Sequence, residues 1–356
     1  MKYLFPVVKT MNPKVKPDES RLGFGNYFTD HMFVLDYSVN RGWHGGRIVP
    51  YGKLVLPPAA RVFHYGQEMF EGMKAYGREN GVPVIFRADK HIERAQDANA
   101  RMCIPELDTE LITDAVNQLV EVDKDWIPSA EGTALYVRPF IIATEPKLSV
   151  GPSVSYIFAI ILSPVGPYYE EGIAPASVYV ETEYIRSVIG GPGYVKVGAN
   201  CANTFLPVKN ATTAGFNQVL WLDAKSRKYV EEIGNANAFF VIDGEVITPP
   251  LAGTVLPGIT RDSAITLLRD FGYYIREEQI AIEDIYRLHA EGRVQEVFST
   301  GTSVTVSPVG KITWNDKEIV INNGEMGPVA KRLYNELSGI HTGKIEDTHG
   351  WIQPIK

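Results

Sequence analysis

The sequence predicts a two-domain protein of the α+β or mixed α/β class. With 356 residues, of which 45% are hydrophobic, the chain exceeds the size at which one core usually suffices. Strand-like runs and amphipathic helical stretches occur in both halves, without the regular alternation of a β-α-β fold. Near the middle, 164–177 contains three prolines and two glycines, as is typical of a linker. We therefore expect a smaller N-terminal domain over 1–163 and a larger C-terminal domain over 178–356.

The first half is expected to consist mostly of strands, interrupted by helices. Apolar residues recur at helical spacing over 90–102, and Asp89 fits the N-cap of this helix. A second amphipathic pattern predicts a helix over 111–120. The runs that predict strands are 32–38, 82–86, 134–143 and 153–162.

The second half has its own strands, helices and turn signals. Gly272 and Gly292 fit the position just after a helix end, and Asp243-Gly244 fits the turn of a hairpin. Strands are expected near 218–222, 238–242 and 295–299, and helices near 261–271, 283–291 and 327–339.

Charge and cysteine content narrow the class of partner. The net charge of -7 gives no global attraction for nucleic acid or anionic lipid, which favours a small-molecule partner. Cys103 and Cys201 have no metal-ligand spacing, and two cysteines so far apart fit a reducing, cytoplasmic setting. The apolar run 156–162 is too short to cross a bilayer. We expect neither a membrane segment nor a metal site.

Lys196 lies in the glycine-rich stretch "GGPGYVKVGANC". A nucleotide P-loop requires Gly-Lys followed by Ser or Thr, but Val195 precedes and Val197 follows this lysine. The dinucleotide pattern G-x-G-x-x-G also fails, because its sixth position is Lys196 itself. A solvent-exposed lysine in a glycine-rich loop remains an alternative interpretation. The apolar neighbours favour a partly desolvated amine, which loses its proton more easily and can condense with an aldehyde such as pyridoxal phosphate.

Pyridoxal phosphate would require donors for its phosphate and an acid for its ring nitrogen. "LPGITRD" starts a helix, whose first N–H groups at Ile259 and Thr260 suit an anion, and "STGTS" adds Thr302. An ordinary helix start and a strand-ending turn remain alternatives. Glu231 and Glu232 end an apolar strand, so one is expected to point inward and the other to solvent. A pair of solvated glutamates is the alternative.

The ordered motifs resemble those of the branched-chain-amino-acid aminotransferases, which are pyridoxal-phosphate enzymes of fold type IV. The resemblance runs from about Arg21 to the C-terminus. It implies a homodimer with the active site at the interface of two domains. The motifs are "FGNYFTDHM", "FHYGQEMFEGMKAY", "LYVRP", "GGPGYVKVGAN", "QVLWLD", "EEIGNAN", "LPGITRD", "GRVQEVFSTGTS" and "SPVG".

The resemblance implies a role for each cofactor-binding residue. Lys196 matches the lysine that holds the cofactor covalently and later moves the proton of the substrate Cα. Glu232 matches the partner of the pyridine nitrogen, which leaves Glu231 as the outward acid. Arg94 matches the arginine that binds the phosphate. The remaining cofactor-binding positions are Ile259, Thr260 and Thr302 in the phosphate cup and Arg186 beside the ring.

The resemblance also implies transamination of leucine, isoleucine and valine with 2-oxoglutarate by ping-pong chemistry. The substrate carboxylate would meet Tyr65 and the turn at Thr302-Ser303, and Arg138 would lie near the entrance. The aliphatic side chain would lie among aromatic groups, although these could equally be core aromatics and Arg138 an ion-paired surface group. The matching aromatic positions are Phe28, Phe70 and Tyr136.

One position departs from the family pattern. After Asn200 the family typically has a tyrosine whose hydroxyl reaches the phenolate oxygen of the cofactor, and here the residue is Cys201. A thiol is shorter and a weaker donor. The alternatives that stay open are a D-amino-acid aminotransferase, an aminodeoxychorismate lyase and a pyridoxal-phosphate-binding relative of low activity.

Overall fold

The computed structural model describes residues 2–79, 81–166 and 174–355, and its chain divides into two compact units. Unit 1 comprises Met1–Tyr168, Lys196–Gly198 and Gly339–Lys356, and unit 2 comprises Tyr169–Val195 and Ala199–Ser338. The predicted single domain over 178–356 is therefore wrong at its C-terminal end. The physical reason is strand pairing, because β17 (Ile352–Pro354) lies antiparallel to β5 (Val84–Phe86) of unit 1. Half of the predicted linker, 167–173, lies outside the described residues.

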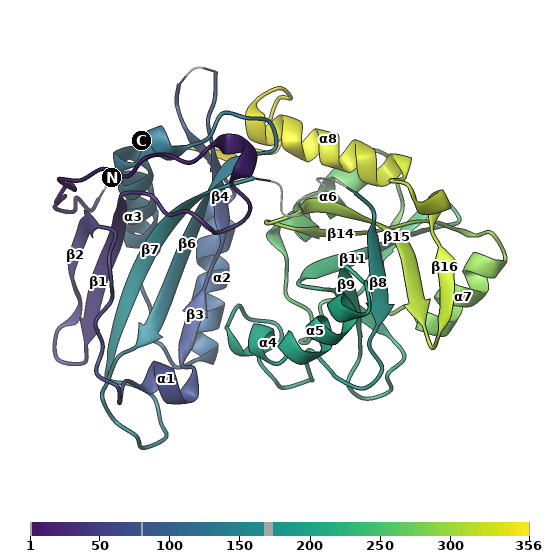
Figure 1. Cartoon of the computed structure of the whole chain (residues 1–356), viewed down its shortest axis with the longest axis horizontal. Helices are drawn as coiled ribbons and strands as arrows, with labels where there is room; N and C mark the ends of the chain where they lie inside the picture. Colours follow the sequence, from purple (N-terminus) through teal and green to yellow (C-terminus); the bar gives the residue numbers. More distant parts are fainter. Residues whose placement is uncertain (1, 80, 167–173, 356) are drawn as a thin grey trace. The chain divides into compact units, whose positions relative to one another are not determined.

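Unit 1 is built on an antiparallel sheet of eight strands (Figure 1). The strand order is β17-β5-β4-β6-β7-β1-β2, and β3 also pairs with β6. Its other strands are β1 (His31–Ser38), β2 (Gly42–Pro50), β3 (Glu68–Phe70), β4 (Met73–Tyr76), β6 (Ala134–Ala143) and β7 (Ser155–Val165). Its helices are α1 (Arg61–Tyr65), α2 (Ala88–Arg101) and α3 (Thr109–Val122).

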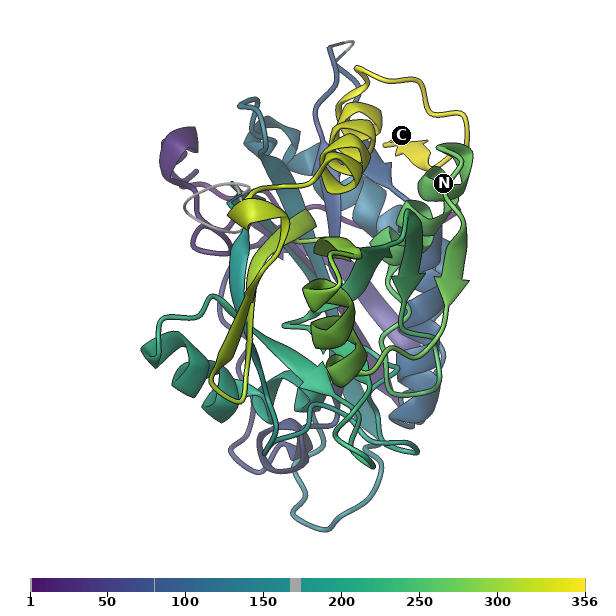
Figure 2. The ribbon, with the colours of Figure 1, turned by 90° about the vertical axis from the view of Figure 1, so that its right-hand side faces the viewer.

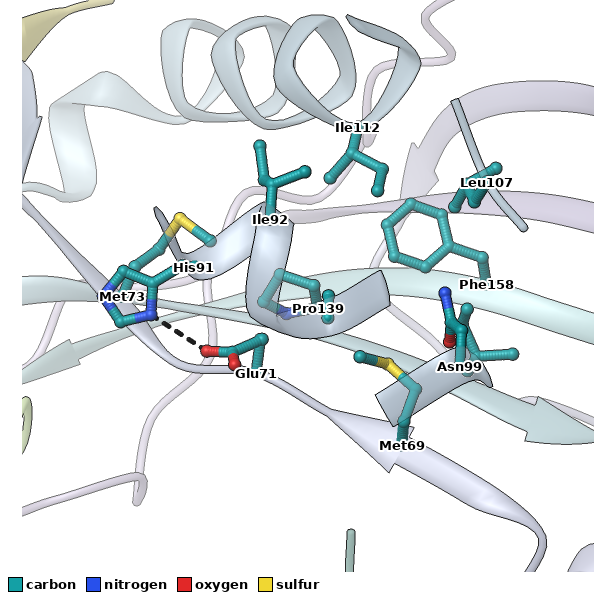
Figure 3. A pocket seen from close by; sticks show the side chains of 12 residues that line it. Met69, Glu71, Met73, His91, Ile92, Asn99, Leu107, Ile112, Pro139 and Phe158 are labelled. Carbon is teal, nitrogen blue, oxygen red and sulfur yellow. Dashed lines mark hydrogen bonds and ion pairs between the residues drawn. The ribbon is translucent and has the colours of Figure 1, made fainter. Parts of the chain in front are cut away.

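The two faces of the unit 1 sheet carry different kinds of side chain. Met69 and Met73 lie against Ile92 of α2 and Ile112 of α3, and they line a small apolar cavity with them (Figure 3). Since successive side chains of a strand point to opposite faces, Phe70 points away from these helices. The face toward the helices thus carries the apolar core together with Glu71, and the opposite face carries Phe70.

Unit 2 contains a mixed sheet of nine strands. β10, β9, β8, β15, β14 and β11 pair in this order, and β10 pairs with β11 as well, so these strands form a closed ring. α5 (Phe205–Thr213), α6 (Ile259–Asp270) and α7 (Ile282–Ala290) pack against the ring (Figures 1 and 2). Closure removes exposed strand edges. The strands are β8 (Ala176–Val180), β9 (Gln218–Leu222), β10 (Val230–Ile233), β11 (Ala236–Ile242), β12 (Glu245–Thr248), β13 (Ile275–Glu277), β14 (Val294–Gly301), β15 (Thr305–Trp314) and β16 (Lys317–Val320).

The remaining helices are short or lie near the C-terminus. α4 (Ala199–Ala202) follows the lysine loop, and α8 (Pro328–Thr342) follows the last strand of unit 2. Its first N–H groups, at Val329 and Ala330, donate to the buried carboxylate of Glu296 at 2.8 and 3.0 Å. In the described part of the chain, no helix has the length and apolar character needed to cross a membrane.

Several predicted elements are confirmed, and one cap is wrong. β6 and β9 have the predicted bounds, and Gly272 and Gly292 follow helix ends with φ of 88° and 72°. The predicted hairpin turn is confirmed, with Ile242 paired to Glu245. Asp89, however, lies in the first turn of α2, and the N-cap is Arg87 with φ 49° and no side-chain cap bond. The helix thus begins closer to β5 than the apolar pattern indicates.

Candidate active site

Lys196 lies over an aromatic ring of unit 1. Its Nζ is 4.8 Å from the centre of the Phe70 ring, and its carbonyl oxygen accepts a hydrogen bond of 3.1 Å from the Phe70 N–H. Glu68, two residues earlier on β3, accepts a hydrogen bond from the Gly198 N–H. Lys196 is half-buried. Both sides of the lysine are therefore tied to β3, and its amine rests on an electron-rich face that favours a cation.

Arg138 joins the same aromatic cluster. Its guanidinium carbon is 4.9 Å from the ring centre of Phe70 and 5.2 Å from that of Tyr136, and Nη2 donates to the Tyr136 hydroxyl at 3.2 Å. Gly72 makes room for this hydroxyl, because a Cβ at Gly72 would lie 1.7 Å from it. The sheet face thus presents a cation and two aromatic rings beside Lys196. Such a surface can accept both an apolar and an acidic side chain.

Arg94 forms a buried ion pair on α2. Its Nε and Nη2 donate to the two oxygens of Glu71 at 2.7 and 3.0 Å, and His91 Nδ1 lies 2.9 Å from Glu71 Oε2 (Figure 3). Burial alone would raise the pKa of Glu71, but the charge of Arg94 and the hydrogen bond with His91 hold that pKa well below its usual range. Burial lowers the pKa of His91, and the charge of Lys196 contributes to this effect. The group is thus electrostatically coupled to Lys196.

Glu232 lies in unit 2 with a cationic partner. It is 2% exposed, forms an ion pair with Arg186 and accepts a hydrogen bond of 3.2 Å from Asn237 Nδ2. The prediction that Glu231 points to solvent is wrong, because Glu231 is 8% exposed and burial raises its pKa. The Glu231 carboxyl group interacts instead with Thr254 and Arg186, which are distant in sequence. The alternation of side chains along a strand determines which face a side chain lies on, but not whether that face is exposed to solvent.

The start of α6 lies close to the strand that carries Asn237. Gly258 is the N-cap, and a Cβ there would lie 2.0 Å from the Asn237 side-chain oxygen. Asn237 Nδ2 also donates to the carbonyl of Leu256 at 2.9 Å. Ile259 and Thr260 are the first residues of α6, so their N–H groups lie at the positive end of the helix.

The strand register places the glycine-threonine turn beside the same asparagine. Glu232 pairs with Asn237, and Asn237 pairs with Thr300. Thr302 and Ser303 follow in the turn between β14 and β15. The predicted acid and both predicted phosphate-binding segments of unit 2 are therefore brought together by three adjacent strands.

The loop before Lys196 is held by an asparagine and a tightly packed glycine. Asn200 Nδ2 donates to the carbonyls of Pro192 and Val195 at 2.8 and 2.7 Å. A Cβ at Gly193 would lie 1.7 Å from the Ser187 hydroxyl oxygen and 2.6 Å from the Thr254 carbonyl oxygen. Gly193 is thus required for close packing of this loop.

Three other residues were singled out from the sequence. Phe28 stacks on Tyr51 with ring centres 5.1 Å apart, and the Tyr65 hydroxyl, on the exposed side of α1, donates to the Leu148 carbonyl. Cys201 is half-buried on α4. The contacts described for the Phe28 and Tyr65 side chains are therefore with residues other than Lys196.

Two residues of these groups were missed from the sequence. Glu71 stands between apolar residues in "MFEGM", a position where a carboxylate is expected to be buried and paired, so it could have been found. Asn237 carries no such signal. Its importance comes from strand register and from contacts with Glu232 and Leu256 that are distant in sequence.

The donor chemistry fits an anionic, aldehyde-bearing cofactor. Arg186 Nη1 and Thr300 Oγ1 are buried polar atoms that have no hydrogen-bond partner within the described chain, and both can donate to an anion. The first N–H groups of α6 lie at the positive end of that helix, which suits an anion. Lys196 supplies an amine. Across residues 2–79, 81–166 and 174–355, no three or more His, Cys, Asp or Glu side chains are grouped as metal ligands.

Comparison with known proteins agrees with this chemistry. Residues 68–312 match the family described as Amino-transferase class IV. The chain is 49% identical to branched-chain-amino-acid aminotransferase 2 of Bacillus subtilis (strain 168), over 97% of this chain and 95% of that protein. It is 48% identical to branched-chain-amino-acid transaminase 1 of the same organism, over 98% of both chains.

A solved structure shows the same fold. The branched-chain amino acid aminotransferase from Escherichia coli matches with a TM-score of 0.75 and 26% identity, over 92% of this chain and 99% of that chain. The predicted fold type IV and the family resemblance are both confirmed. The chain belongs to the class IV aminotransferases and, within them, to the branched-chain-amino-acid aminotransferases.

Proposed function

We propose that this chain is a pyridoxal-phosphate-dependent transaminase of leucine, isoleucine and valine, with 2-oxoglutarate as amino acceptor. The observation that carries the proposal is the position of Lys196, whose amine lies 4.8 Å above Phe70 and whose main chain is tied to β3. The bound cofactor would supply an aldehyde for amino-group transfer and a ring that withdraws electrons. The residues that would hold it are Lys196, Arg94, Glu232, Arg186, Ile259, Thr260 and Thr302.

Lys196 would act at its Nζ. A neutral amine can accept the proton of the substrate Cα. It can then give this proton to the cofactor carbon that would carry the transferred nitrogen. Glu232 would keep a proton on the pyridine nitrogen, because its carboxylate is buried and paired with Arg186. Asn237 orients that carboxylate through its hydrogen bond of 3.2 Å. A protonated ring is needed for the electron withdrawal that loosens the Cα proton.

The substrate would be held by polar groups at one end and by aromatic groups at the other. We assign the α-carboxylate to Tyr65 and to the turn of Thr302 and Ser303. Phe28, Phe70 and Tyr136 would surround the aliphatic side chain. Arg138 would meet the side-chain carboxylate of glutamate or 2-oxoglutarate. A hydrophobic pocket discriminates one methylene by only about 1–3 kcal/mol, so relaxed selectivity among the branched substrates is expected.

We also propose that the enzyme works as a homodimer in the cytoplasm. The family resemblance supports the dimer. The two cysteines, Cys103 and Cys201, are both free thiols, which agrees with a reducing compartment.

The test is to purify the full chain and record its visible spectrum while amino donors are added. A cofactor absorption band that disappears with L-leucine and returns with 2-oxoglutarate is expected. The matched control is Lys196→Ala, which should bind cofactor without covalent attachment and lose activity. Comparison of L-leucine, D-alanine and aminodeoxychorismate separates the proposal from related activities. Turnover of D-alanine alone, or a band unchanged in Lys196→Ala, would contradict it.

A further inference from the structure

Glu71 fixes the orientation of the Arg94 guanidinium. A guanidinium is planar and carries five N–H donors in a rigid fork. Because Arg94 meets Glu71 through both Nε and Nη2, its plane and its rotation in that plane are set. The Nη1 end of the fork therefore points away from Glu71. The fixed plane also fixes the direction in which the Nη1 donors lie.

The Glu71 carboxylate is itself held in place from several sides. Its backbone N–H donates to the Pro139 carbonyl at 2.8 Å, and the Gly72 N–H donates to Glu71 Oε2 at 3.0 Å. His91 Nδ1 lies on the same oxygen. Glu71, His91 and Arg94 have side chains that are 1%, 2% and 7% exposed. The group has little freedom to rearrange.

The charges of this group are also fixed. The pKa of Glu71 lies well below its usual range, because the charge of Arg94 and the hydrogen bond with His91 outweigh the effect of burial. The pKa of His91 is lowered, mainly by burial. The lowered pKa favours the neutral form of His91, and its Nδ1 lies within hydrogen-bond distance of the carboxylate. The Glu71 carboxylate and the Arg94 guanidinium therefore face each other as a charged, buried pair.

Glu71 and His91 line a small apolar cavity (Figure 3). Its volume of about 10 Å³ leaves room for no more than one water molecule. Met69, Met73 and Ile92 line it. The electrostatic interactions that orient Arg94 are stronger in these apolar surroundings than they would be at a solvent-exposed surface.

We propose that Glu71, supported by His91, is a positioning group that aims Arg94 at the phosphate of the cofactor. Glu71 acts on the phosphate only through Arg94. This inference rests on the proposed function, which assigns Arg94 to phosphate binding. It adds that the affinity for the phosphate depends on a carboxylate that does not itself contact the cofactor.

The experiment compares two probes on the full chain freed of cofactor: pyridoxal phosphate and pyridoxal, which lacks the phosphate. Glu71→Gln keeps the shape of the side chain but removes its charge. We expect it to weaken pyridoxal phosphate binding about 10-fold or more, as loss of an orienting partner does at other ligand sites. The affinity for pyridoxal should stay within about twofold. The dissociation constants come from spectral titration, so activity is not needed.

Further variants keep the test decisive. Asp123→Asn is the matched control, because Asp123 is also a buried carboxylate on a histidine, 2.6 Å from His31 Nδ1, and it should leave both affinities unchanged. Arg94→Lys should lose the same phosphate-specific affinity, and the double variant Glu71→Gln/Arg94→Lys should lose little more than Arg94→Lys alone. If Glu71→Gln does not fold, Glu71→Asp replaces it.

The results that overturn the inference differ from those that overturn the proposed function. Equal loss of pyridoxal phosphate and pyridoxal binding in folded Glu71→Gln would give Glu71 a merely structural role. Additive effects of Glu71→Gln and Arg94→Lys would show that Glu71 acts independently of Arg94. A wild-type chain that binds neither probe would instead contradict the proposed function.

Discussion

The backbone N–H of Phe70 donates a hydrogen bond of 3.1 Å to the carbonyl oxygen of Lys196, and the amine of the same lysine lies 4.8 Å from the centre of the Phe70 ring. One strand thus positions both ends of the lysine. The amine of Lys196 can move by rotation about the side-chain bonds, but the main chain of the residue is held by the hydrogen bond to Phe70. This arrangement suits a group that must form a bond to the cofactor and also shuttle a proton.

Phe70→Leu should lower kcat/KM for leucine by roughly 3- to 30-fold. The ring contacts the cations of both Lys196 and Arg138, and such contacts contribute about 0.5–2 kcal/mol each. Steady-state kinetics measures the effect, and thermal unfolding checks the fold. Phe216→Leu in unit 2 is the control, because Phe216 packs on Tyr179. Equal kinetic losses in the two variants would contradict a specific role of Phe70.

Arg138→Met should raise KM for 2-oxoglutarate by about 10-fold or more and change KM for leucine by less. The guanidinium is the cation of the aromatic face, and methionine keeps length and apolar contact while it removes charge. Loss of a charge-assisted bond costs about 1.5–3 kcal/mol. Separate titration of donor and acceptor in the two half-reactions measures the difference. A parallel rise in both KM values would mean that Arg138 supports the fold of the pocket instead.

Local patterns in the sequence predict much of the fold. The strands at 134–143 and 218–222 carry strong apolar signals, and the glycines after α6 and α7 mark true helix ends. β2 and β15 were missed, because glycine and polar residues break the apolar pattern of "GWHGGRIVP" and "TVSPVGKITW". Their positions are fixed by pairing with distant strands, β1 for β2 and β8 and β14 for β15.

Lys196 could be singled out from the sequence because it is one cation in a glycine-rich loop, and its role stays a prediction. The site could not be predicted where function depends on register or burial. Asn237 is aligned with Glu232 and Thr300 only because β10, β11 and β14 are neighbours. Glu231 is buried and interacts with Thr254 and Arg186, two residues distant in sequence, which no local pattern shows. The C-terminal strand likewise joins unit 1 through a pairing that spans most of the chain.

Gly193→Ala should destabilise the loop before Lys196. The added Cβ would lie 1.7 Å from the Ser187 hydroxyl oxygen and 2.6 Å from a backbone carbonyl oxygen, so the backbone must shift. Overpacking of this kind costs about 1–3 kcal/mol. Denaturant unfolding should show this loss, and cofactor affinity should fall with it. Gly52→Ala, whose nearest neighbouring atom would be 3.7 Å away, should leave both unchanged. An unfolding midpoint of Gly193→Ala equal to that of Gly52→Ala would contradict the packing argument.

His341→Phe should make the protein more resistant to acid. His341 stacks on Tyr76, and burial, together with the charges of Lys74 and Arg78, lowers its pKa from 6.5 to about 3. Between these two pH values the unfolded chain binds the proton and the folded chain does not, so stability is lost as pH falls from 6.5 toward 3. At about pH 4.5 the loss through this group is about 3 kcal/mol.

Denaturant titrations of the wild type and of His341→Phe at about pH 7 and about pH 4.5 test this expectation. The phenyl ring keeps the stacking and cannot titrate. The variant should therefore lose less stability than the wild type on acidification, by up to about 3 kcal/mol. An equal acid sensitivity of both proteins would show that His341 is not neutral in the fold.

Cys201→Tyr should change the colour of the bound cofactor and the pH at which this colour changes. Cys201 follows Asn200, whose side chain closes the lysine loop, and it lies at the start of α4. The family resemblance gives this position a tyrosine whose hydroxyl reaches the phenolate oxygen of the cofactor. A phenol is longer and a stronger donor than a thiol, so it stabilises negative charge on that oxygen better. Cys201→Ser is the matched control, because its hydroxyl is as short as the thiol and should leave the spectrum close to that of the wild type. Absorption spectra of the three proteins over a pH series measure the effect, and identical spectra for Cys201→Tyr and the wild type at every pH would show that other groups determine the charge on the phenolate oxygen.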